Sequence, residues 1–91
     1  MTITIKGREI ELKYSIRALI IFENITGESF KGDTLEQMVT LFYSIVLSST
    51  KDFTINFDEF LDEIDNNPEL IKQYTDWMLD MNKVQDLIKK K

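Results

Sequence analysis

The 91-residue sequence contains neither cysteine nor histidine. Without cysteine, the chain has no disulfide and no thiolate for a zinc site or for nucleophilic catalysis. Without histidine, it lacks the commonest general base near neutral pH and the commonest ligand of transition metals. Its serines and threonines have no imidazole to activate them. We therefore expect a protein that is not an enzyme and that holds no metal or cofactor.

Positive charge is also scarce, as are long hydrophobic runs. Eleven Lys and Arg against 16 Asp and Glu give a net charge of −5, which disfavours binding to nucleic acid because phosphates repel an acidic surface. The longest apolar run, residues 18–22, is too short to cross a membrane. Residues 1–6 alternate instead of forming the apolar core of a signal peptide. These features indicate a cytoplasmic protein whose partners are other proteins.

Apolar residues are plentiful enough for a packed core. They make up 43% of the chain and include six Phe, three Tyr and one Trp, so the chain should not be disordered. We expect a single domain over residues 1–91, because a chain of this length suffices for one domain and no more.

The first fourteen residues alternate in the manner of a β-hairpin. A type II′ turn at residues 7–8 would place Ile5 opposite Ile10. A turn at residues 6–7 keeps the same apolar face, so both registers are compatible with the pattern. The residues on this apolar face are Ile3, Ile5, Ile10, Leu12 and Tyr14.

Helix-capping signals predict the remaining elements. Ser15 is a candidate N-cap and Gly27 a candidate C-terminal cap for the first helix. Thr34 with Gln37, and Asn56 with Glu59, have the spacing of capping boxes. Pro68 suits the first position of the last helix. The sequence thus predicts an α+β fold, mainly α, with a hairpin over 1–14 and helices over 15–27, 34–48, 56–65 and 68–90.

The second predicted helix is apolar over most of its circumference. Only Glu36, Gln37, Thr40 and Ser44 interrupt the apolar residues, and they form one narrow stripe. Such a helix is either a central core helix or has one flank open to a partner. The last helix adds an aromatic and Met stripe, which is either core or an adaptable binding surface. The candidate partner-binding residues from both helices are Met38, Leu41, Phe42, Ile45, Trp77, Met78 and Met81.

Residues 48–59 partly match an EF-hand calcium loop. With Glu59 at the twelfth position, Ser48 occupies the first position, which should be Asp, and Phe53 the sixth, which should be Gly. We favour a capped amphipathic helix and keep a calcium-binding regulatory module, or a generic adaptor, as the alternative. Asp58, Asp62 and Asp65 share one face of this helix, which we interpret as a solvated face.

Several short motifs in the first third of the chain resemble one protein family. After the hairpin come an Arg17-Ala18 step, a Phe22-Glu23 pair and the segment Thr26-Gly27-Glu28-Ser29-Phe30. This arrangement is similar to that of tail assembly chaperones of long-tailed bacteriophages. The later layout is also similar, with a hydrophobic helix, a Phe-x-x-Phe-Leu segment at residues 57–61 and a final helix carrying Trp77.

The resemblance implies a function. Proteins of this family bind the long, helical tape measure protein and keep it soluble before the tail tube polymerises around it. It implies a homo-oligomer and a longer version produced by ribosomal frameshifting. It also implies a location in the host bacterial cytoplasm and absence from the mature virion.

Overall fold

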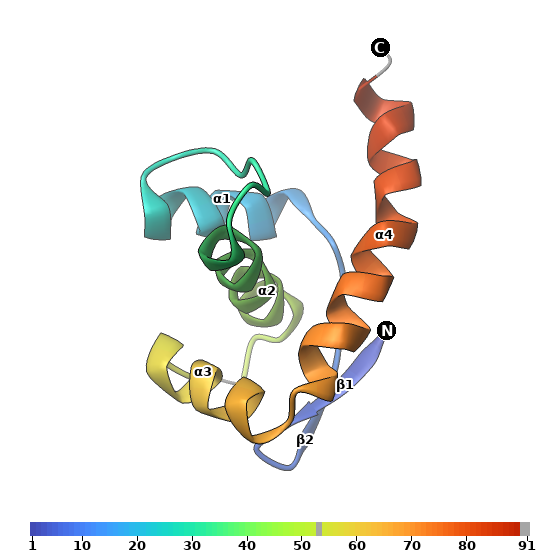
Figure 1. The fold of residues 1–91 in the computed structure, drawn as a ribbon. Helices are drawn as coiled ribbons and strands as arrows, with labels where there is room; N and C mark the ends of the chain where they lie inside the picture. Colours follow the sequence, from blue (N-terminus) through green and yellow to red (C-terminus); the bar gives the residue numbers. More distant parts are fainter. Residues whose placement is uncertain (53, 90–91) are drawn as a thin grey trace.

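The computed structural model describes the backbone of residues 1–52 and 54–89 and the side chains of these residues as far as residue 79. An antiparallel hairpin is followed by four helices, which confirms the predicted α+β fold (Figure 1). Each helix lies within about a residue of its predicted bounds, although residue 90 is outside the described residues. The elements are β1 (Thr2–Ile5), β2 (Arg8–Glu11), α1 (Ile16–Thr26), α2 (Leu35–Ser49), α3 (Phe57–Asn66) and α4 (Glu69–Lys89).

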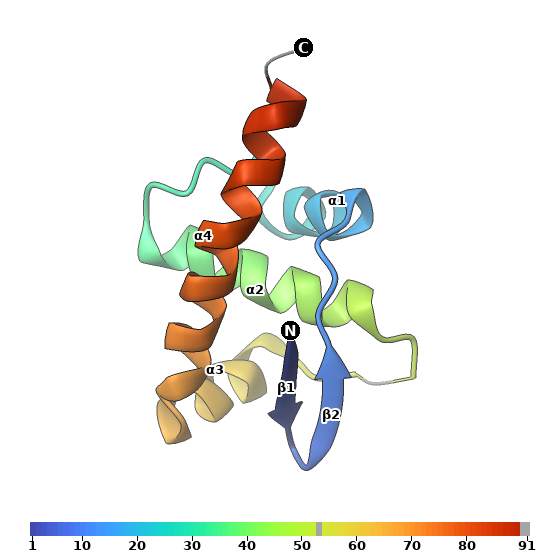
Figure 2. The ribbon, with the colours of Figure 1, turned by 90° about the vertical axis from the view of Figure 1, so that its right-hand side faces the viewer.

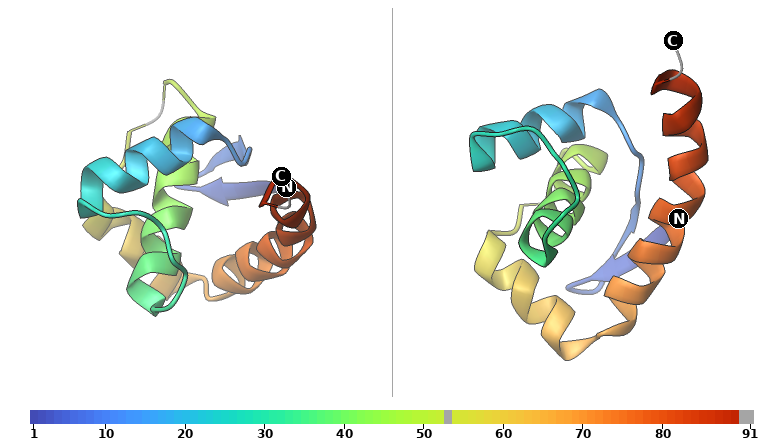
Figure 3. Two further views of the ribbon diagram at one scale, coloured as in Figure 1. Left: turned by 90° about the horizontal axis from the view of Figure 1, so that it is seen from above. Right: turned by 45° about the horizontal axis from the view of Figure 1, so that its top comes forward.

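Helix α2 lies at the centre of the molecule. Helix α1 crosses it on one side, while α3 and the hairpin lie on the opposite side (Figures 1 and 2). Helix α4 leaves α3 beside the hairpin and continues past the other elements, so its C-terminal turns extend beyond the rest of the molecule (Figure 3). This arrangement surrounds the most apolar helix of the chain with the other elements of the same copy.

The hairpin adopts the second of the two registers that the sequence allowed. Ile3 pairs with Ile10 and Ile5 with Arg8, so of the two alternatives the type II′ turn at residues 7–8 is not the one that forms. The turn residues are Lys6 and Gly7, both with positive φ, at 53° and 76°. Positive φ at both central positions is the type I′ geometry, whose twist matches that of the flanking strands. Glycine adopts this geometry without steric cost, whereas Lys6 needs support from elsewhere.

Helix α3 supplies that support to Lys6. The Lys6 backbone N–H donates to the Glu63 carboxylate at 3.0 Å, and the Lys6 ammonium pairs with the Glu59 carboxylate at 2.8 Å. The hydrogen bond from Lys6 lowers the pKa of Glu59, and the N–H of Asn56 lowers it further. Because the Lys6–Glu59 ion pair is exposed to solvent, its contribution to stability is small. It nevertheless holds the turn of the hairpin against α3.

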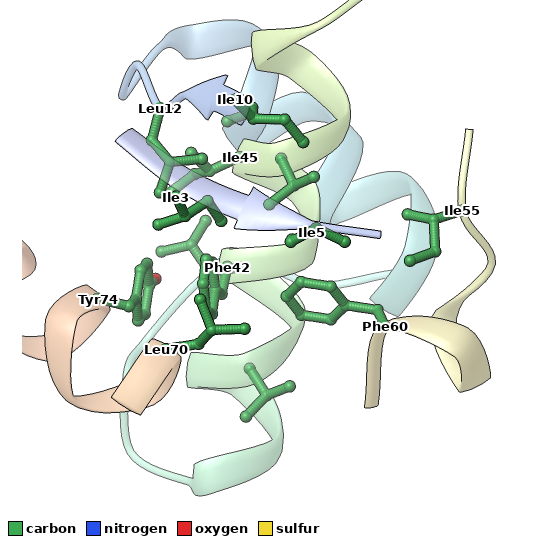
Figure 4. Close-up of a cluster of buried hydrophobic side chains, with 14 of the residues drawn as sticks. Ile3, Ile5, Ile10, Leu12, Phe42, Ile45, Ile55, Phe60, Leu70 and Tyr74 are labelled. Carbon is green, nitrogen blue, oxygen red and sulfur yellow. The ribbon is translucent and has the colours of Figure 1, made fainter. Parts of the chain in front are cut away.

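The core forms around Phe42 of α2. Its ring stacks on Tyr74 of α4 at a centroid distance of 4.2 Å and meets the edge of Phe60 of α3 at 5.0 Å. Figure 4 shows Ile3 and Ile5 of β1 beside the same cluster. The fully buried aliphatic residues of α2 are Leu41, Ile45 and Val46. The hypothesis of a central core helix therefore describes most of α2.

Tyr74 of α4 carries a buried hydroxyl. Its side chain is fully buried, and its hydroxyl has no hydrogen bond to any residue in the described part of the chain. Burial raises the pKa of Tyr74 far above its ordinary value, and the nearby Tyr14 raises it further. A buried hydroxyl without a partner loses its hydration and gains nothing in return.

Tyr74→Phe should therefore stabilise the protein. Removing the hydroxyl keeps the stacked ring and abolishes the desolvation cost, so we expect the free energy of unfolding to rise by about 1 kcal/mol in urea denaturation. Tyr43→Phe is the matched control. The Tyr43 hydroxyl donates to the carbonyl oxygen of Ile55 at 2.6 Å, so its loss should destabilise by a similar amount. Destabilisation by both substitutions would contradict the unpaired state of Tyr74.

Candidate partner-binding surface

The structure places most of the predicted partner-binding residues in the core. Leu41, Phe42 and Ile45 are fully buried, and Met78 is 6% exposed. Their side chains are covered by other elements of the same chain, because α2 occupies the centre of the fold and Met78 continues the inward stripe of α4. We therefore do not assign these residues to a surface that meets a partner.

The remaining predicted residues differ in their positions. Met38 and Trp77 are half-buried and pack against the core, with Trp77 beside Tyr74 at a centroid distance of 6.4 Å. Each keeps part of its side chain accessible. The side chain of Met81 lies outside the described residues.

The exposed apolar surface lies elsewhere, chiefly on α1. Ile16 is 76% exposed and Ile20, one turn further along, is 54% exposed, so the two form an apolar pair on the outer face of this helix. Leu35 and Leu79 are also strongly exposed, at 75% and 65%. None of these residues was among the candidates predicted from the sequence. For Ile20 the signal was the apolar run from residue 18 to 22, which extends beyond the face that a short helix buries.

Three of the four residues in the polar stripe of α2 are buried, and only Glu36 is exposed. Gln37 is 7% exposed, Thr40 is 4% exposed and Ser44 is fully buried. The hydroxyl of Ser44 donates to the carbonyl oxygen of Thr40 at 2.8 Å, which satisfies it within the helix. A buried polar side chain needs such partners, so each position in the stripe has a defined hydrogen bond or lines a pocket.

Gln37 connects α2 to the loop that follows α1. Its side-chain oxygen accepts the backbone N–H of Lys31 at 2.9 Å and of Gly32 at 2.8 Å. Its side-chain nitrogen donates to the Glu28 carboxylate at 3.0 Å. The hydroxyl of Thr34 caps α2 by accepting the Gln37 backbone N–H, as predicted. The predicted return contact of a capping box is replaced by these bonds to the loop, so that half of the prediction is wrong.

The segment at residues 26–30 shapes the end of α1. The Thr26 hydroxyl accepts the backbone N–H of Glu28 at 3.2 Å, and Gly27 takes a φ of 77° to end the helix. Phe30 then folds back so that its ring meets that of Phe22 edge-on at 5.4 Å. These local contacts carry Glu28 to the position where Gln37 binds it.

A surface pocket of about 340 Å³ lies where α1, α2 and α3 come together. Gln37 and Thr40 of the buried polar stripe line it, and the apolar side chains of Ile25 and Phe57 contribute further walls. Its carboxylates are Glu28 and Glu36. None of the residues that line it is basic. We refer to this site as the Glu28–Glu36 pocket.

The two carboxylates of this pocket differ in their surroundings. Glu28 accepts from the Gln37 side chain. The carboxylate of Glu36 has neither a hydrogen bond nor an ion pair to the residues that the structure describes. Phe57 is positioned by Tyr43, whose ring meets it edge-on at 5.3 Å. The pocket thus combines a positioned carboxylate, a second carboxylate with no partner among the described residues, and an aromatic wall.

The residues considered for calcium serve other contacts. Glu59 accepts the Asn56 backbone N–H at 3.1 Å, completing the predicted capping box of α3, and also pairs with Lys6. The Ser48 hydroxyl donates to the carbonyl oxygen of Ile45. Within the described ranges, 1–52 and 54–79, side chains do not assemble three or more potential metal ligands.

Of the helices described, none is long and apolar enough to span a membrane. Comparisons with protein-family models, with curated proteins and with solved structures find no match to this chain.

Proposed function

We propose that this protein is a tail assembly chaperone of a long-tailed bacteriophage, which binds the tape measure protein and keeps it soluble. The observation that carries the proposal is the combination of an N-terminal hairpin with the motifs of α1, above all the segment at residues 26–30. In the structure this segment ends α1 and packs Phe30 against Phe22.

The exposed apolar pair on α1 supports a role in holding a client. Ile16 and Ile20 present apolar surface that a helical client can cover, without any bond being made or broken. The net charge of −5 favours solubility of the chaperone and of its complex. Reversible apolar contact and a highly charged remainder are the physical requirements of such a chaperone.

The proposal has further parts. The protein acts without catalysis, as a homo-oligomer in the host bacterial cytoplasm, accompanied by a longer version that arises by frameshifting. It leaves the tail before the virion is complete. A generic protein–protein adaptor is the second candidate, since the exposed pair on α1 suits any apolar helix. The contacts of Glu59 give no support to the calcium-binding alternative.

Co-expression tests the proposed function. The protein is produced together with the long coiled protein encoded beside its gene, and the soluble fraction is purified through a tag on the smaller chain. We expect the long protein to stay soluble and to elute with several copies of this one. A neighbouring protein that remains insoluble and unbound would contradict the proposal and favour the adaptor.

A variant pair locates the client surface in the same assay. Ile16→Ser with Ile20→Ser should reduce recovery of the client about tenfold or more, because each isoleucine removes apolar area from water on binding. Leu79→Ser is the matched control, since this leucine is similarly exposed but lies on α4. Equal losses from both variants would show that α1 has no special part in binding.

A further inference from the structure

We infer that the Glu28–Glu36 pocket binds an arginine side chain presented by a helix of the client protein. The inference rests on the proposed function, because it names the chemistry by which part of the client is recognised. It concerns a site separate from the exposed apolar pair Ile16 and Ile20, since neither of these two residues lines the pocket.

Charge determines the sign of the ligand. Glu28 and Glu36 both line the pocket, and no lining residue offsets them with a positive charge. The Glu36 carboxylate has no partner in the part of the chain described, so a cation can pair with it without displacing an existing bond. Glu28 is already oriented by the Gln37 amide, which leaves its second oxygen available for a donor.

The walls favour a cation with an apolar stem and a flat head. Ile25 is 48% exposed and can cover the methylene groups of a long side chain. Phe57 adds an aromatic side chain to the lining, and a guanidinium stacks on aromatic rings better than an ammonium does. A guanidinium also offers several N–H donors in one plane, so it can bind a carboxylate through two hydrogen bonds at once. Arginine fits this combination better than lysine.

The floor of the pocket is preorganised. Gln37 and Thr40 are buried, and Gln37 is held by three hydrogen bonds to the loop between α1 and α2. The pocket volume of about 340 Å³ lies at the small end of the range for ligand pockets, roughly 300 to 1,000 Å³. It suits one long side chain, which an approaching helix can insert while its backbone remains on the surface.

A peptide titration tests the inference with the full chain. The probe is a synthetic amphipathic helix of alanine and leucine with a single arginine at its centre, and a second peptide has lysine there instead. Binding is followed by two-dimensional NMR of the ¹⁵N-labelled protein. We expect the Gln37 side-chain amide and the Glu36 and Thr40 backbone amides to shift, with the lysine peptide binding about threefold more weakly.

Charge-matched variants separate the pocket from the overall acidity of the protein. Glu28→Gln with Glu36→Gln removes both carboxylates while leaving Gln37 an oxygen to which it can donate, and should weaken arginine-peptide binding about tenfold. Glu9→Gln with Glu23→Gln changes the net charge equally at exposed sites outside the pocket and should change binding less than twofold. Equal effects of the two double variants, or equal affinity for the lysine peptide, would overturn the inference.

Co-expression with the client distinguishes this result from the proposed function. If the arginine peptide binds in the pocket but the tape measure protein is not retained, the inference about arginine binding is supported and the chaperone proposal fails. If the client is retained equally by the wild type and by the Glu28→Gln, Glu36→Gln variant, the chaperone proposal stands and the pocket inference is overturned.

Discussion

Phe42→Ala should lower the free energy of unfolding by about 3 to 5 kcal/mol. The ring is fully buried, stacked on Tyr74 and in contact with the edge of Phe60, so its removal leaves a cavity bounded by two other rings. In a domain of this size each kcal/mol lowers the melting temperature by about 4 to 8 °C. Thermal and urea unfolding, followed by circular dichroism, measure the effect.

Leu35→Ala is the control for this prediction. Leu35 begins the same helix but is 75% exposed, so its truncation should change the free energy of unfolding by less than about 0.5 kcal/mol. Wild-type stability of the Phe42→Ala variant would contradict the assignment of Phe42 to the core. If the prediction holds, any loss of client binding by this variant reflects unfolding and says nothing about the binding surface.

Gln37→Leu should lower the free energy of unfolding by about 2 to 3 kcal/mol. Leucine has a similar size but cannot accept the backbone N–H groups of Lys31 and Gly32, and it leaves the Glu28 carboxylate without its amide donor. We expect the loop between α1 and α2 to open. Hydrogen exchange at the amides of residues 31 and 32 should therefore become faster, well before the global unfolding transition.

Glu36→Gln is the control for the buried amide. This residue adjoins Gln37 in the sequence but is exposed, so its neutralisation should leave both stability and hydrogen exchange close to wild type. Gln37→Glu separates the two sets of contacts made by this side chain. It keeps oxygens that can accept from the loop N–H groups, but it places a carboxylate against that of Glu28. Unchanged exchange at residues 31 and 32 in Gln37→Leu would contradict the assigned role of the amide.

These variants distinguish three different roles for residues of helix α2. Phe42 is a core residue, Gln37 a structural link to a loop, and Glu36 an exposed carboxylate at a pocket. All three were visible in the sequence as parts of a helix that is apolar apart from one stripe. Their separate roles follow from which neighbour each position of α2 meets.

The elements of this fold were predictable because their signals are local. Ser15, Thr34 and Asn56 each accept a backbone N–H three residues further on, so the caps depend only on short stretches of sequence. Gly27 ends α1 with a positive φ for the same local reason. The alternation of apolar residues likewise indicated the hairpin and the face that it buries, whichever turn it formed.

Contacts between distant segments decided the remaining features. Glu63 and Glu59 of α3 support the turn at Lys6, where φ is positive. Both glutamates lie more than fifty residues from Lys6 in the sequence. The same holds for the candidate site. The sequence indicated an unusual stripe on α2, but whether its members face solvent, a loop or a pocket depends on where α1 and α3 pack. A local pattern specifies which residues share a face of a helix, and only tertiary packing specifies what that face contacts.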